Sequence, residues 1–190
     1  FNIVDKRIQC VFTFPADHGP HPDYRTEWWY FTGNLTGDDG SEFGYQFTIF
    51  RTGLTREEPQ RASAWSSNQI YMAHVALTDI SGDRFYYSER FSRGGNGLSG
   101  ARINPLRVWQ EDWQILQQSD ESHYDIPILR IAAEDDKFTI DLSVQALKPV
   151  VLQGDEGLSQ KGSGEGNASY YYSFTRLKTR GGSPEAAGGA

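Results

Sequence analysis

Residues 27–51 of the sequence read EWWYFTGNLTGDDGSEFGYQFTIFR, two runs rich in apolar side chains on either side of a short polar segment. Apolar residues that alternate with polar ones are typical of β-strands, because successive side chains point to opposite faces. The intervening residues 36–40, TGDDG, are polar and able to adopt positive φ, as a tight turn requires. We therefore predict an antiparallel hairpin with strands at 27–35 and 43–51.

The same pattern continues along the rest of the chain, and few windows have helical spacing. Further candidate strands lie at 70–79, 84–91, 112–118, 126–133, 138–147 and 169–178, with weaker ones at 8–14 and 105–110. Successive strands joined by tight turns favour antiparallel pairing between neighbours, in a sandwich or an up-and-down barrel. We favour the barrel, because closure removes exposed edge strands and an eight-stranded barrel holds one small ligand.

Composition limits the possible functions. The 190 residues carry a net charge of −7, which argues against a nucleic-acid partner. Cys10 is the single cysteine, so the chain forms no internal disulfide. No run approaches the ~18 apolar residues of a transmembrane segment. We expect one domain over 1–179, followed by a Gly/Ala-rich linker or tail at 180–190.

Two motifs resemble cofactor or metal sites. Residues 95–100, GNGLSG, fit G-x-G-x-x-G, but Pro105 follows and no helix pattern begins there, so we predict a loop. Residues 15–25, PADHGPHPDYR, contain His18 and His21 close to carboxylates. We predict no metal ion and no cofactor here, but a rigid entry loop that closes one barrel end, with its histidines hydrogen-bonded to backbone.

Strand alternation separates the chain's aromatic residues into two faces, and the sequence does not say which face lines the interior. One titratable group interrupts the aromatic face of each of the first three strands: Glu27, Arg51 or His74. A buried carboxylate and imidazole are able to transfer protons, so His74 and Glu27 are the candidate catalytic residues. Alternatively, Glu27 pairs with Arg51 as an internal strut and His74 is a packed core residue. The candidate ligand-binding residues are Trp28, Trp29, Tyr30, Tyr45, Phe47, Arg51, Met72 and Tyr171.

Five blocks resemble the AttH/carotenoid hydratase family, which includes hydroxyneurosporene synthases and proteins labelled predicted secreted hydrolases. They are DHGPHPDYRTEWWYFTGNL (17–35), FGYQFTIFR (43–51), AHVALTD (73–79), LQGDEGLSQKG (152–162) and ASYYYSFTRL (168–177). The resemblance implies a pair of lipocalin-like β-barrels, of which this chain is similar to the N-terminal one. It also implies a secreted or periplasmic location and an apolar ligand such as a polyene. For the hydratases it implies a lyase reaction, the addition of water to an isolated double bond without an organic cofactor.

The sequence departs from the family in one respect, because it lacks the consecutive Asp-His-Glu-Trp of the family's second barrel. We therefore expect this chain alone to be inactive, and its partner to be a second lipocalin-like barrel, in the same parent chain or in a homodimer. In the intact protein a buried acid would protonate the alkene, aromatic faces would stabilise the cation, and water would capture it. The alternative is a non-catalytic module that binds or transports a lipid or secondary metabolite. A hydrolase has no nucleophile motif in this sequence.

Overall fold

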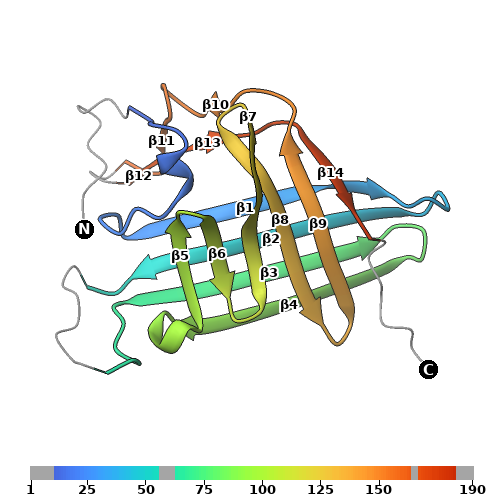
Figure 1. Cartoon of the computed structure of the whole chain (residues 1–190), viewed down its shortest axis with the longest axis horizontal. Helices are drawn as coiled ribbons and strands as arrows, with labels where there is room; N and C mark the ends of the chain where they lie inside the picture. Colours follow the sequence, from blue (N-terminus) through green and yellow to red (C-terminus); the bar gives the residue numbers. More distant parts are fainter. Residues whose placement is uncertain (1–10, 56–62, 164–166, 183–190) are drawn as a thin grey trace.

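The computed structural model describes residues 11–55, 63–163 and 167–182, and these residues form an all-β fold. One sheet has the order β1-β2-β3-β4, and a second has the order β14-β9-β8-β7-β6-β5. The strands of these two sheets are β1 (Thr26–Thr36), β2 (Glu42–Gly53), β3 (Gln69–Asp79), β4 (Arg84–Arg93), β5 (Ser99–Ile103), β6 (Leu106–Gln110), β7 (Trp113–His123), β8 (Ile126–Asp135), β9 (Phe138–Ala146) and β14 (Leu177–Gly181). In Figure 1, β1 to β4 run across the view behind β5 to β9, which cross them steeply.

Neighbouring strands pair antiparallel in chain order, which confirms the predicted all-β, lipocalin-like, up-and-down architecture. Two short ladders complete the chain: β10 (Val151–Leu152) pairs with β13 (Tyr172–Ser173), and β11 (Leu158–Gln160) pairs with β12 (Ala168–Tyr170). The described helices are two 3₁₀ turns, η1 (Ala16–His18) and η2 (Gly95–Gly97). No helix in the described ranges is long and apolar enough to span a membrane.

The first hairpin has the predicted form. β1 and β2 pair over their whole length, and Gly40 in the connecting turn has φ of 83°. The glycine-rich motif at 95–100 forms η2 and the start of β5, so the predicted loop is shorter than expected. Here Asn96 has φ of 53°, which lies outside the helical region.

Three sequence predictions are modified by the structure. The predicted strand at 169–178 is divided among β12, β13 and β14, because each part pairs with a different segment. β14 continues to Gly181, two residues into the predicted tail, while 183–190 lie outside the described residues. Cys10 and the first three residues of the weak candidate strand at 8–14 also lie outside them, and its described part, 11–14, is not a strand.

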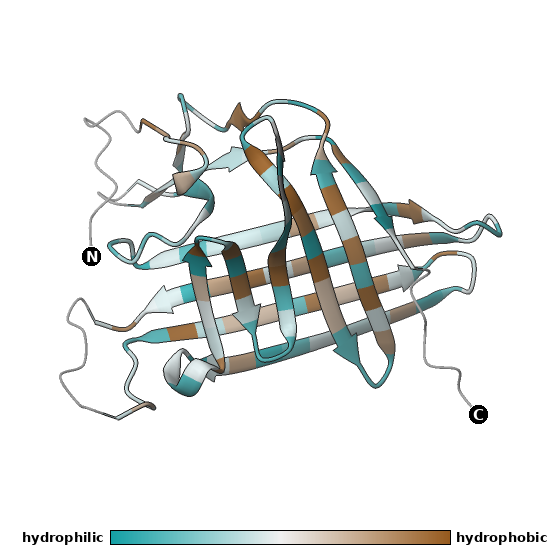
Figure 2. Ribbon diagram, viewed as in Figure 1, coloured by the Kyte–Doolittle hydropathy of each residue, from teal (hydrophilic) through white to brown (hydrophobic). Residues whose placement is uncertain are grey.

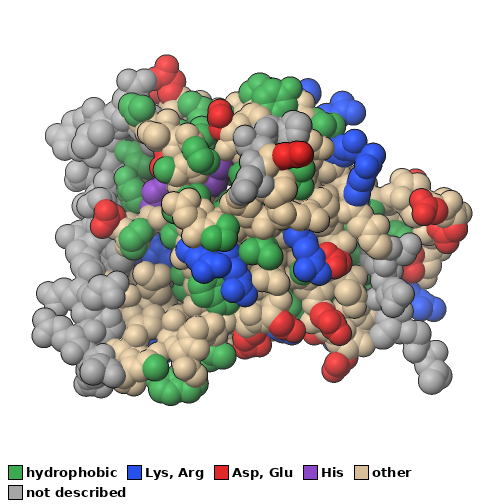
Figure 3. Space-filling view, in the orientation of Figure 1, with side chains coloured by type: hydrophobic (Ala, Val, Ile, Leu, Met, Phe, Trp, Pro, Cys, Tyr) green, Lys and Arg blue, Asp and Glu red, His purple; other side chains and the backbone are tan. Residues whose placement is uncertain are grey.

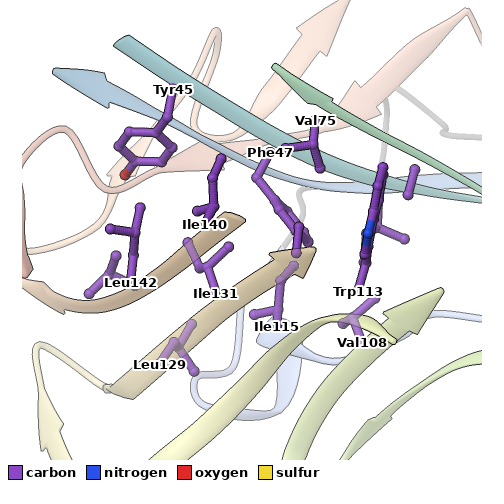
Figure 4. Close-up of a cluster of buried hydrophobic side chains, with 14 of the residues drawn as sticks. Tyr45, Phe47, Val75, Val108, Trp113, Ile115, Leu129, Ile131, Ile140 and Leu142 are labelled. Carbon is purple, nitrogen blue, oxygen red and sulfur yellow. The ribbon is translucent and has the colours of Figure 1, made fainter. Parts of the chain in front are cut away.

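The core lies between the two sheets. Phe47 and Val75 of the first sheet pack with Ile115, Ile131 and Ile140 of the second (Figure 4). Hydrophilic and hydrophobic bands alternate along several strands in Figure 2, as expected for strands with one buried side. This alternation fixes which side chains face the interior and which face outward.

Candidate functional site

The candidate residues of the first sheet lie on two opposite faces. In β3, Tyr71, Ala73, Val75 and Leu77 are buried against the second sheet, so the alternate residues, including Met72 and His74, face outward. Through the strand register, Trp28 and Tyr30 share this outer face. The remaining candidates of this sheet face inward: Glu27, Trp29, Tyr45, Phe47 and Arg51.

The two candidate catalytic residues are therefore not brought together. His74 projects from the outer face, where its ring centroid lies 5.9 Å from that of Phe50. Its nearest carboxylate is that of Glu89, with Nε2 and Oε2 3.8 Å apart. Glu27 projects inward, on the other side of the sheet. His74 is also 39% exposed at its side chain, so the structure does not place it in the packed core.

Among the inward candidates, Tyr45 and Phe47 belong to the hydrophobic core, at 4% and 0% exposure. Trp29 packs against the same core, and its indole N–H donates to the backbone oxygen of His18, 3.0 Å away. The structure thus gives all three a packing role, and their contact with a ligand stays a prediction.

Glu27 is the centre of a polar cluster at one end of the first sheet. Its Oε2 accepts a hydrogen bond from Arg51 Nε at 2.6 Å, which is the strut that the sequence offered as an alternative. Its Oε1 lies 2.6 Å from His21 Nδ1 and accepts the backbone N–H of His21 at 2.7 Å. His21 Nε2 lies 3.0 Å from Asp17 Oδ1, so the imidazole bridges two carboxylates.

This environment sets the charge of His21. Its hydrogen bond to Glu27 is the main cause that raises the pKa of His21 from 6.5 to about 9, with Asp17 adding to the effect and burial opposing it. His21 is therefore a cation at neutral pH. The cluster alternates Asp17, His21, Glu27 and Arg51, so each carboxylate contacts a cation.

Arg51 connects this cluster to the entry loop. Its guanidinium is 1% exposed, and Nη2 donates to the backbone oxygens of His21 and Tyr24, at 2.7 and 2.8 Å. The loop is thus attached to β2 by a buried side chain, in addition to the backbone bond that the Gly53 N–H donates to the oxygen of Arg25. Arg51 thereby holds His21 and Tyr24 of the predicted entry loop against β2.

His18 attaches the other side of the loop. Its Nε2 lies 2.9 Å from the backbone oxygen of Asp125, and its Nδ1 lies 2.9 Å from the Tyr172 hydroxyl. Burial lowers the pKa of His18 and raises that of Tyr172, so both are neutral at pH 7. In that state His18 donates from Nε2 to Asp125. The Tyr172 hydroxyl has one proton and two acceptors within reach, His18 Nδ1 at 2.9 Å and the backbone oxygen of Asp17 at 3.1 Å. His18 has the predicted backbone partner, whereas the side chain of His21 bonds to carboxylates.

The sequence analysis missed Tyr172. Of the three consecutive tyrosines, the sequence indicated Tyr171. The ring of Tyr171 does contact that of another candidate, Trp28, and their centroids are 5.8 Å apart. Alternation indicated that the tyrosines occupy both faces, but the contact of Tyr172 with His18 joins residues 154 positions apart. No local pattern reports such a contact.

The outer face of the first sheet is rich in aromatic side chains. The register places Trp28, Phe50, Met72 and Phe91 in one row across all four strands. On β4, Phe85, Tyr87 and Phe91 are 62–66% exposed. The outer face of the second sheet, seen in Figure 3, instead carries scattered Lys, Arg, Asp and Glu side chains, including the Arg130–Asp141 ion pair.

In the described part of the chain, no group of three or more His, Cys, Asp or Glu side chains is arranged to hold a metal ion. The prediction that the entry loop binds none stays a prediction. The histidine nitrogens there are engaged by Glu27, Asp17, Tyr172 and the backbone.

These features define a lipocalin-like β domain with a polar cluster at one end and an open aromatic sheet face. The chain belongs to the AttH-like family, whose model matches residues 6–184, and this confirms the resemblance found in the sequence.

Two solved structures share the fold. An AttH protein from Nitrosomonas europaea is 34% identical, with a TM-score of 0.75, over 90% of this chain and 49% of its own. Kievitone hydratase from Nectria haematococca is 14% identical, with a TM-score of 0.58, over 94% of this chain and 46% of its own, and this likeness shows the fold alone. The chain thus spans about half the length of each. No protein with a curated description matches it in sequence.

Proposed function

We propose that this chain is the N-terminal barrel of a carotenoid-hydratase-like protein, and that it binds an apolar ligand between its aromatic sheet face and a second lipocalin-like barrel. The observation that carries the proposal is the contrast between the two outer faces. The face of β1 to β4 exposes the rings of Phe85, Tyr87 and Phe91, whereas the outer face of the other sheet carries charged pairs such as Arg130 and Asp141. A large exposed apolar patch is typical of a binding surface, because a ligand or partner that covers it removes an unfavourable contact with water.

The length comparison supports a second barrel as the partner. Each of the two structural relatives has about as much chain again outside the matched region. A second domain of similar size, from the same parent chain or from a second copy, would cover the aromatic face and exclude water from a ligand held there. Tyr171 and Trp28 lie at the edge of this face and would contact the same ligand.

On this face His74 is the residue that we propose for proton transfer. A protonated His74 would give its proton to one alkene carbon, and the neighbouring rings would stabilise the cation. Water would then add to the other carbon and return a proton to the imidazole, so the reaction would consume no cofactor. Glu89, rather than Glu27, is the carboxylate on the same face. Glu27 and Arg51 hold the entry loop on the opposite side of the sheet. They would affect ligand binding only indirectly, by stabilising the fold.

The proposal is tested in the protein that naturally carries this chain. Organic extraction followed by mass spectrometry identifies a retained ligand, and incubation with an alkene such as lycopene reports hydration as a mass gain of one water. We expect turnover, lost in His74→Gln and kept in His21→Gln, whose imidazole lies in the polar cluster. Retained ligand without turnover in any condition would favour the alternative, a binding or transport module. Absence of both would refute the proposal.

A further inference from the structure

A row of polar side chains crosses the outer face of the first sheet beside its apolar row. The register aligns Tyr30, Thr48, His74 and Glu89 on four successive strands. It runs directly beside the apolar row that contains Phe50 and Phe91. A ligand that lies on the rings would therefore meet this row of polar groups at one point along its length.

Thr48 is the unusual member of the row. It is 2% exposed although it belongs to the open face, and its Oγ1 has no hydrogen-bond partner among the described residues. A buried hydroxyl without a partner is unfavourable, since it loses its bonds to water and gains none in exchange. Valine would have nearly the same shape without the unpaired hydroxyl.

The residues on each side of Thr48 are able to complete a binding site. Tyr30 is 47% exposed and the His74 side chain 39% exposed, so both have room to turn aside and admit a ligand atom. His74 Nε2 is 3.8 Å from Glu89, too far for a hydrogen bond. A phenol, a hydroxyl and an imidazole thus lie in line, and each is able to donate or accept.

We infer that this row recognises an oxygen atom on the ligand, and hence that an apolar molecule carrying a hydroxyl or carbonyl group binds tighter than a hydrocarbon of the same size. Thr48 bonds the oxygen, while Tyr30 and His74 flank it and the row of Phe50 holds the apolar part. This inference rests on the proposed function, because it assumes that the aromatic face binds the ligand.

The test compares two fifteen-carbon probes that differ by one molecule of water, farnesol, which carries a hydroxyl group, and the hydrocarbon β-farnesene, by calorimetric titration of the protein that naturally carries this chain. One hydrogen bond is worth about 2- to 13-fold in affinity, so we expect farnesol to bind tighter by about that factor. In Thr48→Val the preference should disappear while the affinity for β-farnesene is unchanged. Thr48→Val preserves shape and removes an unpaired hydroxyl, so it should fold as well as the wild type.

Thr78→Val is the matched control, because Thr78 lies on the same face two rows away. It should keep the preference for farnesol. Equal affinity of the wild-type protein for the two probes would overturn the inference while leaving the proposed function intact. A preference that survives in Thr48→Val would overturn it in the same way. If neither probe binds, the proposed function fails and the inference fails with it.

Discussion

Replacing His21 with glutamine tests whether its charge holds the entry loop. Glutamine keeps a hydrogen-bonding side chain but removes the cation between Glu27 and Asp17. A pKa raised from 6.5 to about 9 corresponds to roughly 3 kcal/mol of stability, at about 1.4 kcal/mol per tenfold change in proton affinity. Because the side chain is 36% exposed, solvent screening reduces this contribution to about 1–2 kcal/mol.

The pH dependence gives the sharper result. The folded-state pKa of His21 is raised, so its contribution is fully present below pH 6.5 and is lost as pH rises through about 9. Urea unfolding followed by tryptophan fluorescence should therefore show a wild-type advantage at pH 6 that shrinks towards zero by pH 10. A difference in unfolding free energy between wild type and His21→Gln that is the same at pH 6 and pH 10 would refute the reasoning. Such a difference would come from packing of the side chain, which does not depend on its charge.

Three further predictions concern the ion pair, the open face and metal binding. Arg51→Met should cost about 3–5 kcal/mol in urea unfolding because it removes the buried cation that Glu27 contacts at Oε2 and the bonds to two loop carbonyls, whereas Arg130→Met, at a surface pair, should cost less than about 1 kcal/mol. Light scattering should show that the isolated 190-residue chain forms dimers, and Phe91→Lys should make it monomeric. A wild-type chain that is already monomeric would contradict the proposal that a second barrel covers the aromatic face. Dialysed protein should contain no zinc by elemental analysis, and a stoichiometric amount lost in His18→Ala would show that the entry loop binds metal.

Much of the first sheet was predictable because it is local. The hairpin at 27–51 has its turn and its alternation in one continuous segment, and its register then places Glu27 opposite Arg51. That pairing made the internal strut predictable from sequence. β3 pairs with β2 although residues 54–68 separate them, and β4 and β9 each follow their partner through a short turn.

The candidate site was less predictable, because its contacts join distant segments. His18 meets Tyr172 and the backbone of Asp125, and neither contact has a signal in the spacing of residues. The segment 169–178 reads as one strand in isolation, but its parts pair with three separate partners. Competition among partners is a property of the assembled fold, so a local pattern does not report it.

The sequence by itself determined the strand content, the antiparallel order, the AttH-like resemblance and the division of each strand into two faces. Only the tertiary structure decided which face is inside. Packing of the second sheet buries Tyr71 and Phe47, and thereby places His74 outward and Glu27 inward. The physical reason is that a strand with aromatic residues on both sides has no local preference for burying either, and the choice is made by the sheet that covers it.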